Sequence, residues 1–383
     1  MCIIVKGASK MNGCCQMDEQ MLSKDLKGFQ RHSKIVKKRL VRAIYIHWLL
    51  SFVIAATHQL ASIHLSVTTR LLAIVRPLTH TQTLFARPLA GLAATTEPLT
   101  YDIITDYEQL GQHIADSKPI WPPGTGPGYH ALTYGFLVDQ LVSRVDPKHR
   151  NLSTFVTEEI TYNNKIDFKI GINHGDFFRA ARYRIPTLWQ SLVKLPNWNF
   201  VRFFLKTTID SLNPSSCLSK SVATISELKK SGIAFFNDPK WAATEIAAAN
   251  GFSNARALAK LFSKVLQGKI IRSPNLLTTL SKPIYEGAMD KCWSFPTNSG
   301  HGFWHWRTEK HKSWTSGHPG YGGQMHKGWA FGHPGYGGQM VLMDPQYDLA
   351  YSYVTNGLGP AVVEDRFKEL EKALYDSIKK IYV

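Results

Sequence analysis

Apolar residues recur at helical spacing in several segments of the chain after residue 100. This periodicity predicts helices over residues 103–117, 131–145, 197–212 and 253–266, and a short apolar segment predicts a strand at 168–172. The clearest helix is 363–381, whose apolar face is formed by Val363, Phe367, Leu370, Leu374, Ile378 and Ile381.

Residues 341–356, VLMDPQYDLAYSYVTN, alternate in polarity on both sides of a turn and predict two strands. Strands followed by a terminal amphipathic helix indicate a sheet with a helix packed across one face. Because the middle of the chain is mainly helical, the pattern favours an α+β or α/β sheet domain interrupted by a helical region. We expect the helices over about 100–290 and the sheet with its last helix over about 295–383.

Composition and charge exclude several classes of protein. The chain has 383 residues, of which 44% are hydrophobic, so it is globular and long enough for one large domain or two. Of the net charge of +17, residues 1–50 carry +7, from ten Lys or Arg and three Asp or Glu. The remaining charge is spread thinly and no nucleic-acid-binding motif is present, so we expect no nucleic-acid partner. Five scattered cysteines predict neither a disulfide framework nor a metal site, and no cofactor is expected.

Residues 1–85 form an irregular basic segment that we separate from an ordered domain over 86–383. Within it, the basic residues 37–42 precede a 14-residue apolar run at 43–56. A basic flank before an apolar run is typical of a signal anchor, but this run is shorter than the roughly 20 residues that span a bilayer. Two interpretations stay open: membrane contact through 37–56, or a buried helix in a cytoplasmic protein. Compartment and oligomeric state cannot be read from the sequence.

Two segments offer candidate chemistry. Residues 118–130, KPIWPPGTGPGYH, contain four prolines and predict a stiff surface loop that holds Tyr129 just before a helix. Residues 311–325 are repeated as 326–340 with 12 of 15 positions identical, including all of GHPGYGGQM. We expect the second copy to be a Gly-rich loop that places His333 at the rim of the sheet, because this copy runs directly into the predicted strands. Its counterpart His318 then lies in an inserted copy, and a purely structural turn is the alternative.

Several tryptophans and histidines are interleaved near the start of the sheet region. They would line a substrate site or form a packed aromatic wall, and the sequence leaves both interpretations open. They are Trp293, Trp304, Trp306 and Trp314 with His301, His305 and His311.

Four segments together resemble the beta-lactamase-related serine hydrolases. They are AGLAATTEPL (90–99), W-PPGTGPGYHALTYGFLV (121–138), ANGFSNARALAKLF (249–262) and FGHPGYGGQMVLMDP (331–345). Their order and spacing match this superfamily over about 89–383. The superfamily includes class C beta-lactamases, penicillin-binding proteins, related esterases and LACTB-like animal proteins.

The resemblance implies a beta-lactamase/transpeptidase-like fold, an antiparallel sheet flanked by helices plus a helical region. It also implies acyl transfer through a serine ester, with a small ester, amide or peptide as substrate. By the same resemblance Tyr129 is the proton-relaying tyrosine of the second motif. His333 and Gly335 match the third motif, where His333 would supply positive charge, and Gly335 and His130 would contact the substrate.

The nucleophile motif of this family, Ser-x-x-Lys, is not found where it belongs. No serine before Tyr129 has a lysine three residues later, and Ser66-Val-Thr-Thr resembles the motif without its lysine. The matches at Ser191, Ser226 and Ser377 all follow Tyr129, so we do not assign them. Two hypotheses stay open: a serine hydrolase, or a non-catalytic relative (a pseudoenzyme) that acts in binding or assembly.

Overall fold

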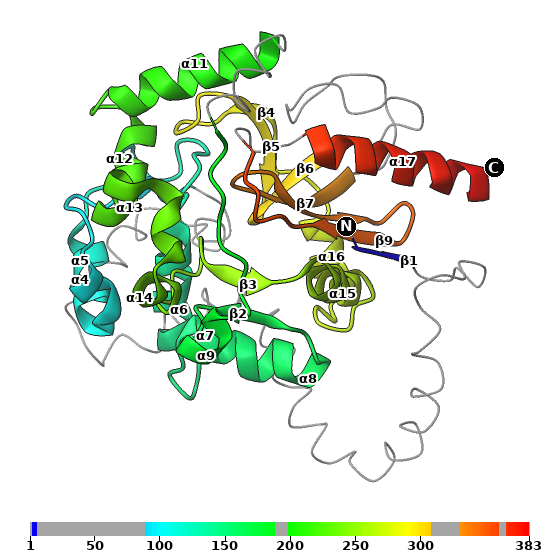
Figure 1. The fold of residues 1–383 in the computed structure, drawn as a ribbon, viewed down its shortest axis with the longest axis horizontal. Helices are drawn as coiled ribbons and strands as arrows, with labels where there is room; N and C mark the ends of the chain where they lie inside the picture. Colours follow the sequence, from blue (N-terminus) through cyan, green and yellow to red (C-terminus); the bar gives the residue numbers. More distant parts are fainter. Residues whose placement is uncertain (1, 6–88, 188–197, 308–328, 360–364, 383) are drawn as a thin grey trace.

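The structure, a computed structural model, describes residues 2–5, 89–187, 198–307, 329–359 and 365–382. A seven-stranded sheet lies beside a helical region, with α17 on one face of the sheet and α15 and α16 near the other (Figure 1). This arrangement confirms the predicted combination of an antiparallel sheet, flanking helices and a helical region. The apolar run at 43–56 lies outside the described residues, and no helix among those described is long and apolar enough to cross a membrane.

The sheet has the strand order β1-β9-β8-β7-β6-β5-β4, and each neighbouring pair is antiparallel. Its strands are β1 (Cys2–Val5), β4 (Tyr285–Met289), β5 (Pro296–Gly300), β6 (Phe303–Arg307), β7 (Trp329–Gly335), β8 (Gln339–Asp344) and β9 (Leu349–Tyr353). The two strands predicted at 341–356 are β8 and β9. The sheet also includes β1, which comes from the segment that the sequence alone separates from the domain. Its other strands begin with β4 at Tyr285, about ten residues before the expected position.

The last helix, α17 (Asp365–Tyr382), covers one face of the sheet. Its apolar stripe, with Phe367, Leu374 and Ile378, packs on Leu342 and Tyr351 of the central strands. Side chains alternate along a strand, so the residues between them face the opposite side. There Phe331, Met343 and Ala350 pack with Val265 of α15 (Ala255–Leu266) and Leu280 of α16 (Pro274–Leu280).

The helical region has its own core, in which Phe136 and Trp241 pack with Leu99, Ile225 and Ile246. The remaining elements are α4 (Tyr101–Thr105), α5 (Tyr107–Asp116), α6 (Thr133–Val145), α7 (Leu152–Phe155), the π-helical turn η4 (Val156–Thr161), α8 (Tyr162–Asn164), β2 (Phe168–Ile170), α9 (His174–Phe177), α11 (Trp198–Leu212), α12 (Cys217–Ala223), α13 (Ser226–Ser231), the 3₁₀ turn η5 (Gly232–Asn237), α14 (Pro239–Ala242) and β3 (Gly251–Ser253). The helix expected over 103–117 is interrupted, because Asp106 ends α4 and its side chain accepts a hydrogen bond from the Gln109 N–H at the start of α5.

One expectation from composition is wrong. Cys217, at the start of α12, forms a disulfide with Cys292 in the turn between β4 and β5, with a Cα–Cα distance of 4.8 Å. The two cysteines are 75 residues apart in sequence. The spacing of scattered cysteines does not reveal which of them the fold brings together, so the sequence alone did not suggest this pair.

Candidate active site

Tyr129 ends the Pro/Gly-rich loop, which is non-helical as predicted and is held from two sides. The Ile120 N–H donates to the Gly91 carbonyl oxygen at 2.7 Å, and the Lys291 N–H donates to the Pro127 oxygen at 3.0 Å. A Cβ at Gly128 would lie 2.4 Å from the Trp121 ring, so the backbone can run there only without a side chain. The loop is therefore fixed immediately before Tyr129.

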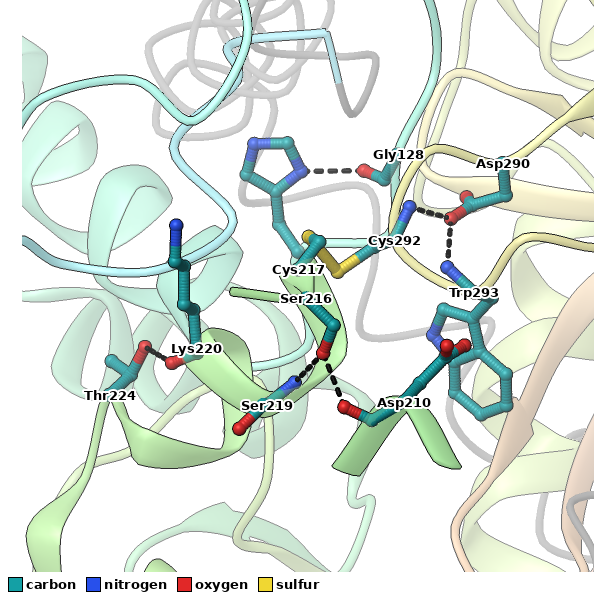
Figure 2. Close-up of a disulfide and its surroundings, with 11 residues drawn as sticks. Gly128, Asp210, Ser216, Cys217, Ser219, Lys220, Thr224, Asp290, Cys292 and Trp293 are labelled. Carbon is teal, nitrogen blue, oxygen red and sulfur yellow. Dashed lines mark hydrogen bonds between the residues drawn. A yellow bond between two sulfur atoms is a disulfide. The ribbon is translucent and has the colours of Figure 1, made fainter. Parts of the chain in front are cut away.

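The buried carboxylate of Asp290 joins this loop to the turn between β4 and β5. It accepts hydrogen bonds from the N–H groups of Cys292 and Trp293, both at 2.8 Å, and also from the Tyr129 N–H. Figure 2 shows the first two of these bonds beside the disulfide. Asp290 thus sets the position of the Tyr129 backbone, a role that no motif in the sequence indicated.

His333 lies within β7, where its backbone is opposite Val341 of β8. The expectation of a loop at this position is therefore wrong: pairing with β8 holds the glycine- and proline-rich segment extended as far as Gly335. The turn itself uses Gly337 and Gly338, both at positive φ (76° and 100°). The sequence thus predicts a loop where the structure has the end of strand β7, and the functional role of His333 stays a prediction.

The structure brings Tyr129 and His333 together although 204 positions separate them in the chain. Their rings are stacked with centroids 5.9 Å apart and planes inclined by 27°. Trp293 and Trp304 pack edge-on against Tyr129 at 5.5 and 6.1 Å, and Trp304 lies 5.8 Å from the His333 ring. All four side chains are half-buried, so the group is packed but retains exposed surface.

The hydrogen bond that His333 makes fixes its tautomer. Its Nδ1 lies 2.6 Å from the Pro334 carbonyl oxygen, which can only accept, so Nδ1 carries the proton. Burial lowers the pKa of His333, and the bond to Pro334 opposes this only in part. At neutral pH the ring is therefore uncharged and presents Nε2 as a hydrogen-bond acceptor. This differs from the positive charge that the family resemblance implies for the third motif.

Tyr129 is also perturbed. Burial, with a smaller contribution from the negative charge of Asp290, raises its pKa to about 12. The phenol is therefore protonated at neutral pH and is a hydrogen-bond donor rather than a base. A protonated phenol beside an imidazole with a free Nε2 forms a donor–acceptor pair.

The two predicted substrate-binding residues have different surroundings. Gly335 ends β7, is half-buried and pairs with Gln339; a Cβ there would lie 2.7 Å from the Gln339 side chain. His130 is only 4% exposed, bonds the Gly128 oxygen through Nδ1 at 2.7 Å, and packs edge-on against Trp121. In this structure His130 therefore supports the loop, and its contact with substrate stays a prediction.

The interleaved aromatic residues divide between the two interpretations. Trp293 and Trp304 lie beside Tyr129, whereas Trp306 is buried in the core under α17. His305 is fully buried, bonds the Leu280 oxygen at 2.9 Å and belongs to the packed wall. Outside the described residues lie Ser66, Ser191, Trp314, His311 and His318.

In the described ranges no three His, Cys, Asp or Glu side chains are grouped so that they could hold a metal ion.

Comparison with known families agrees with the order of the elements. The beta-lactamase family model matches residues 78–374, which is more than half of the chain. The chain belongs to the beta-lactamase family. The match to this beta-lactamase family begins after Ser66. No curated protein matches the chain.

Solved structures show the same fold as this beta-lactamase family member. A penicillin-binding protein homologue from Caulobacter crescentus has 24% identity and a TM-score of 0.57, covering 77% of this chain and 70% of that one. EstA from Arthrobacter nitroguajacolicus Rue61a has 20% identity and a TM-score of 0.61, covering 88% and 83%. A family VIII carboxylesterase has 20% identity and a TM-score of 0.55, covering 76% and 69%. At these identities the likeness establishes the fold, a beta-lactamase-type fold shared by serine hydrolases.

Proposed function

We propose that this protein is an acyl-transfer protein of the serine hydrolase type, in which the Tyr129 hydroxyl donates to the carbonyl oxygen of a small ester, amide or peptide and His333 Nε2 accepts from a substrate N–H or O–H. The observation that carries the proposal is the stacking of these two rings, 5.9 Å apart, at the positions of the second and third motifs. Two titratable side chains with perturbed pKa values, from distant parts of the chain, are a common signature of a functional site.

Each side chain has a role that its protonation state permits. The protonated Tyr129 donates a hydrogen bond to a substrate oxygen or leaving group, and the free Nε2 of His333 accepts one from a substrate N–H or O–H. Trp293 supplies apolar surface beside Tyr129, and Trp304 supplies it beside both rings.

This pair favours an uncharged ligand. Neither Tyr129 nor His333 is positively charged at neutral pH, and the buried Asp290 carboxylate lies close enough to raise the pKa of Tyr129. A ligand carboxylate would be desolvated next to these groups without gaining a cation from either ring. We therefore expect a neutral ester or amide to bind more tightly than the corresponding acid.

A second candidate is a non-catalytic family member that binds such a ligand without turnover. The observation that favours it is the missing Ser-x-x-Lys motif before Tyr129. Without a serine and its lysine there is no acyl acceptor, and the tyrosine has no neighbouring lysine from that motif to lower its pKa.

A fluorophosphonate probe separates the two candidates, because it labels only an activated serine. Absence of a stoichiometric label on the full chain would overturn the acyl-transfer proposal and support binding without turnover. Label at one serine, located by peptide mass, together with hydrolysis of a chromogenic ester would instead establish the hydrolase.

In either case Tyr129→Phe removes only the hydroxyl group. It should weaken binding of a neutral amide ligand by roughly 5- to 10-fold, the cost of about one hydrogen bond, or slow hydrolysis by about 100-fold or more. Tyr162→Phe, at a tyrosine that is 80% exposed, is the matched control. Unchanged binding and turnover in Tyr129→Phe would remove the phenol from the site.

A further inference from the structure

The disulfide joins the helical region to the turn that positions Tyr129. Cys217 is the first residue of α12, and Cys292 lies in the 290–293 turn, where its N–H and that of Trp293 both donate to the Asp290 carboxylate (Figure 2). Both cysteines pack in one cluster with Trp121, Tyr129 and Trp293. The sulfur–sulfur bond is therefore part of the wall beside the candidate site.

The two cysteines differ in accessibility. Cys292 is 3% exposed and its N–H is bonded to Asp290. Cys217 is half-buried, and the exposed residues Asn213 and Ser215 lie just before it. Attack on a disulfide requires a thiolate to reach one sulfur in line with the bond. The difference in burial directs such an attack to Cys217.

We propose that Cys217–Cys292 is a reversible thiol–disulfide exchange site for a small-molecule thiol, and that its redox state controls how firmly Tyr129 is held. The thiolate attacks Sγ of Cys217 and forms a mixed disulfide there. The Cys217–Cys292 bond breaks, its electron pair stays on the Cys292 sulfur, and that sulfur takes a proton from water. A second small thiol releases Cys217 and leaves as the oxidised small-molecule disulfide.

Reduction changes the site through Asp290. With the bond intact, the turn carrying Cys292 is tied to α12 and also to the Tyr129 N–H through Asp290. Once the bond is cut, only hydrogen bonds and packing hold that turn, and local opening becomes easier. The reduced protein therefore holds Tyr129 less rigidly. This consequence is independent of whether the site hydrolyses its ligand.

Thiol–disulfide exchange is tested by treating the full chain with reduced glutathione and quenching the reaction in acid. Free thiols are then alkylated, and the modified cysteines are located by peptide mass mapping. Before reduction we expect the Cys217 and Cys292 peptides to be linked. During reduction we expect glutathione on Cys217 and at least about tenfold less on Cys292. Unlinked Cys217 and Cys292 peptides with free thiols at the start, or an adduct mainly on Cys292 rather than Cys217, would overturn the proposal.

A matched pair of variants repeats the test without the disulfide. With oxidised glutathione and mapping of the modified peptides, Cys292→Ser leaves Cys217 as the one member of the pair, whereas Cys217→Ser leaves the buried Cys292. We expect modification of Cys292 to be at least about tenfold slower. Equal rates in the two variants would contradict the accessibility argument.

The effect of the disulfide on the rigidity of the Tyr129 backbone is measured by amide hydrogen exchange of the wild-type chain in its oxidised and reduced forms. We expect exchange in the peptide containing Tyr129 to accelerate by about tenfold on reduction, while peptides of β8 and α17 stay unchanged. Unchanged exchange at Tyr129, or equal acceleration in all three peptides, would refute a local effect on the site.

Discussion

Glu371 lies on the face of α17 that packs against the sheet, and its pKa is strongly raised. This shift leads to a prediction for the pH dependence of stability. The side chain is fully buried, accepts a hydrogen bond from the Tyr351 hydroxyl through Oε1, and its Oε2 has no partner among the described residues. Burial raises its pKa to about 8, Asp344 adds to the shift, and the Tyr351 bond and Lys368 oppose it. Folding therefore takes up a proton at this residue.

The sign of the pH dependence follows from this proton uptake. Between the ordinary pKa of 4.5 for a glutamate and about pH 8, the folded state binds more protons at Glu371 than the unfolded state does. Stability is therefore lost as pH rises through that window, by up to about 1.4 kcal/mol per pH unit. The full shift corresponds to a ceiling of roughly 5 kcal/mol.

In the upper part of this pH range, the contribution of Glu371 to stability can be separated from that of the buried histidines. His130 and His305 have pKa values lowered to about 4 by burial, so they destabilise the fold only below their unfolded pKa of 6.5. Between about pH 6.5 and 8 the loss from Glu371 alone is roughly 2 kcal/mol. Tyr351 and Tyr375 have pKa values well above 10 and do not titrate there.

The assay is urea denaturation from pH 6.5 to 8.5, followed by tryptophan fluorescence. Glu371→Gln keeps an acceptor for the Tyr351 hydroxyl but cannot ionise, so its midpoint should stay nearly constant while that of the wild type falls. Glu369→Gln, at an exposed position on the same helix, is the control and should follow the wild type. Parallel profiles for the wild type and Glu371→Gln would show that Glu371 is not the titrating group.

Two further predictions concern the Tyr129 loop. Asp290→Asn should lower the pKa of Tyr129, measured by ultraviolet titration, but leave it above 10 because burial is the larger cause; an unchanged pKa would refute the charge effect. Gly128→Ala places a methyl group 2.4 Å from the Trp121 ring and should cost roughly 1–3 kcal/mol in thermal or urea unfolding. Gly175→Ala, with its nearest neighbour at 3.5 Å, should cost far less, and equal losses would refute the clash.

Helices and strands with strong periodicity could be predicted from sequence because their burial pattern is local. The apolar stripe at 363–381 corresponds to α17 (Asp365–Tyr382), and the alternation at 341–356 corresponds to β8 and β9. Prediction from local composition failed where pairing with a neighbouring strand determines the backbone conformation. GHPG (332–335) was expected to be a loop, yet it forms the end of β7 and pairs with residues 339–342 of β8. Weakly apolar strands such as β5, PTNSG, carried no signal of their own.

The site shows the same division. Tyr129 and His333 could be predicted because each sits in a motif with a recognisable sequence. Asp290 and the Cys217–Cys292 bond could not, since their partners lie 161 and 75 positions away and nothing local marks them. The orientation of His130 could not be predicted, because adjacency in sequence says nothing about which way a side chain faces, and here it faces the protein interior.

The raised pKa of Tyr129 bears on the absence of a Ser-x-x-Lys motif before it. Burial and Asp290, which shift the pKa of Tyr129, both act upward, and the described residues add no cation that would act downward. A serine placed beside this phenol without a lysine would therefore meet a proton donor rather than a base. Turnover requires both members of Ser-x-x-Lys, since the lysine would lower the pKa of Tyr129 as well as activate the serine. Binding of a neutral carbonyl compound requires neither, because a protonated phenol and a neutral imidazole already form a hydrogen-bond donor and an acceptor.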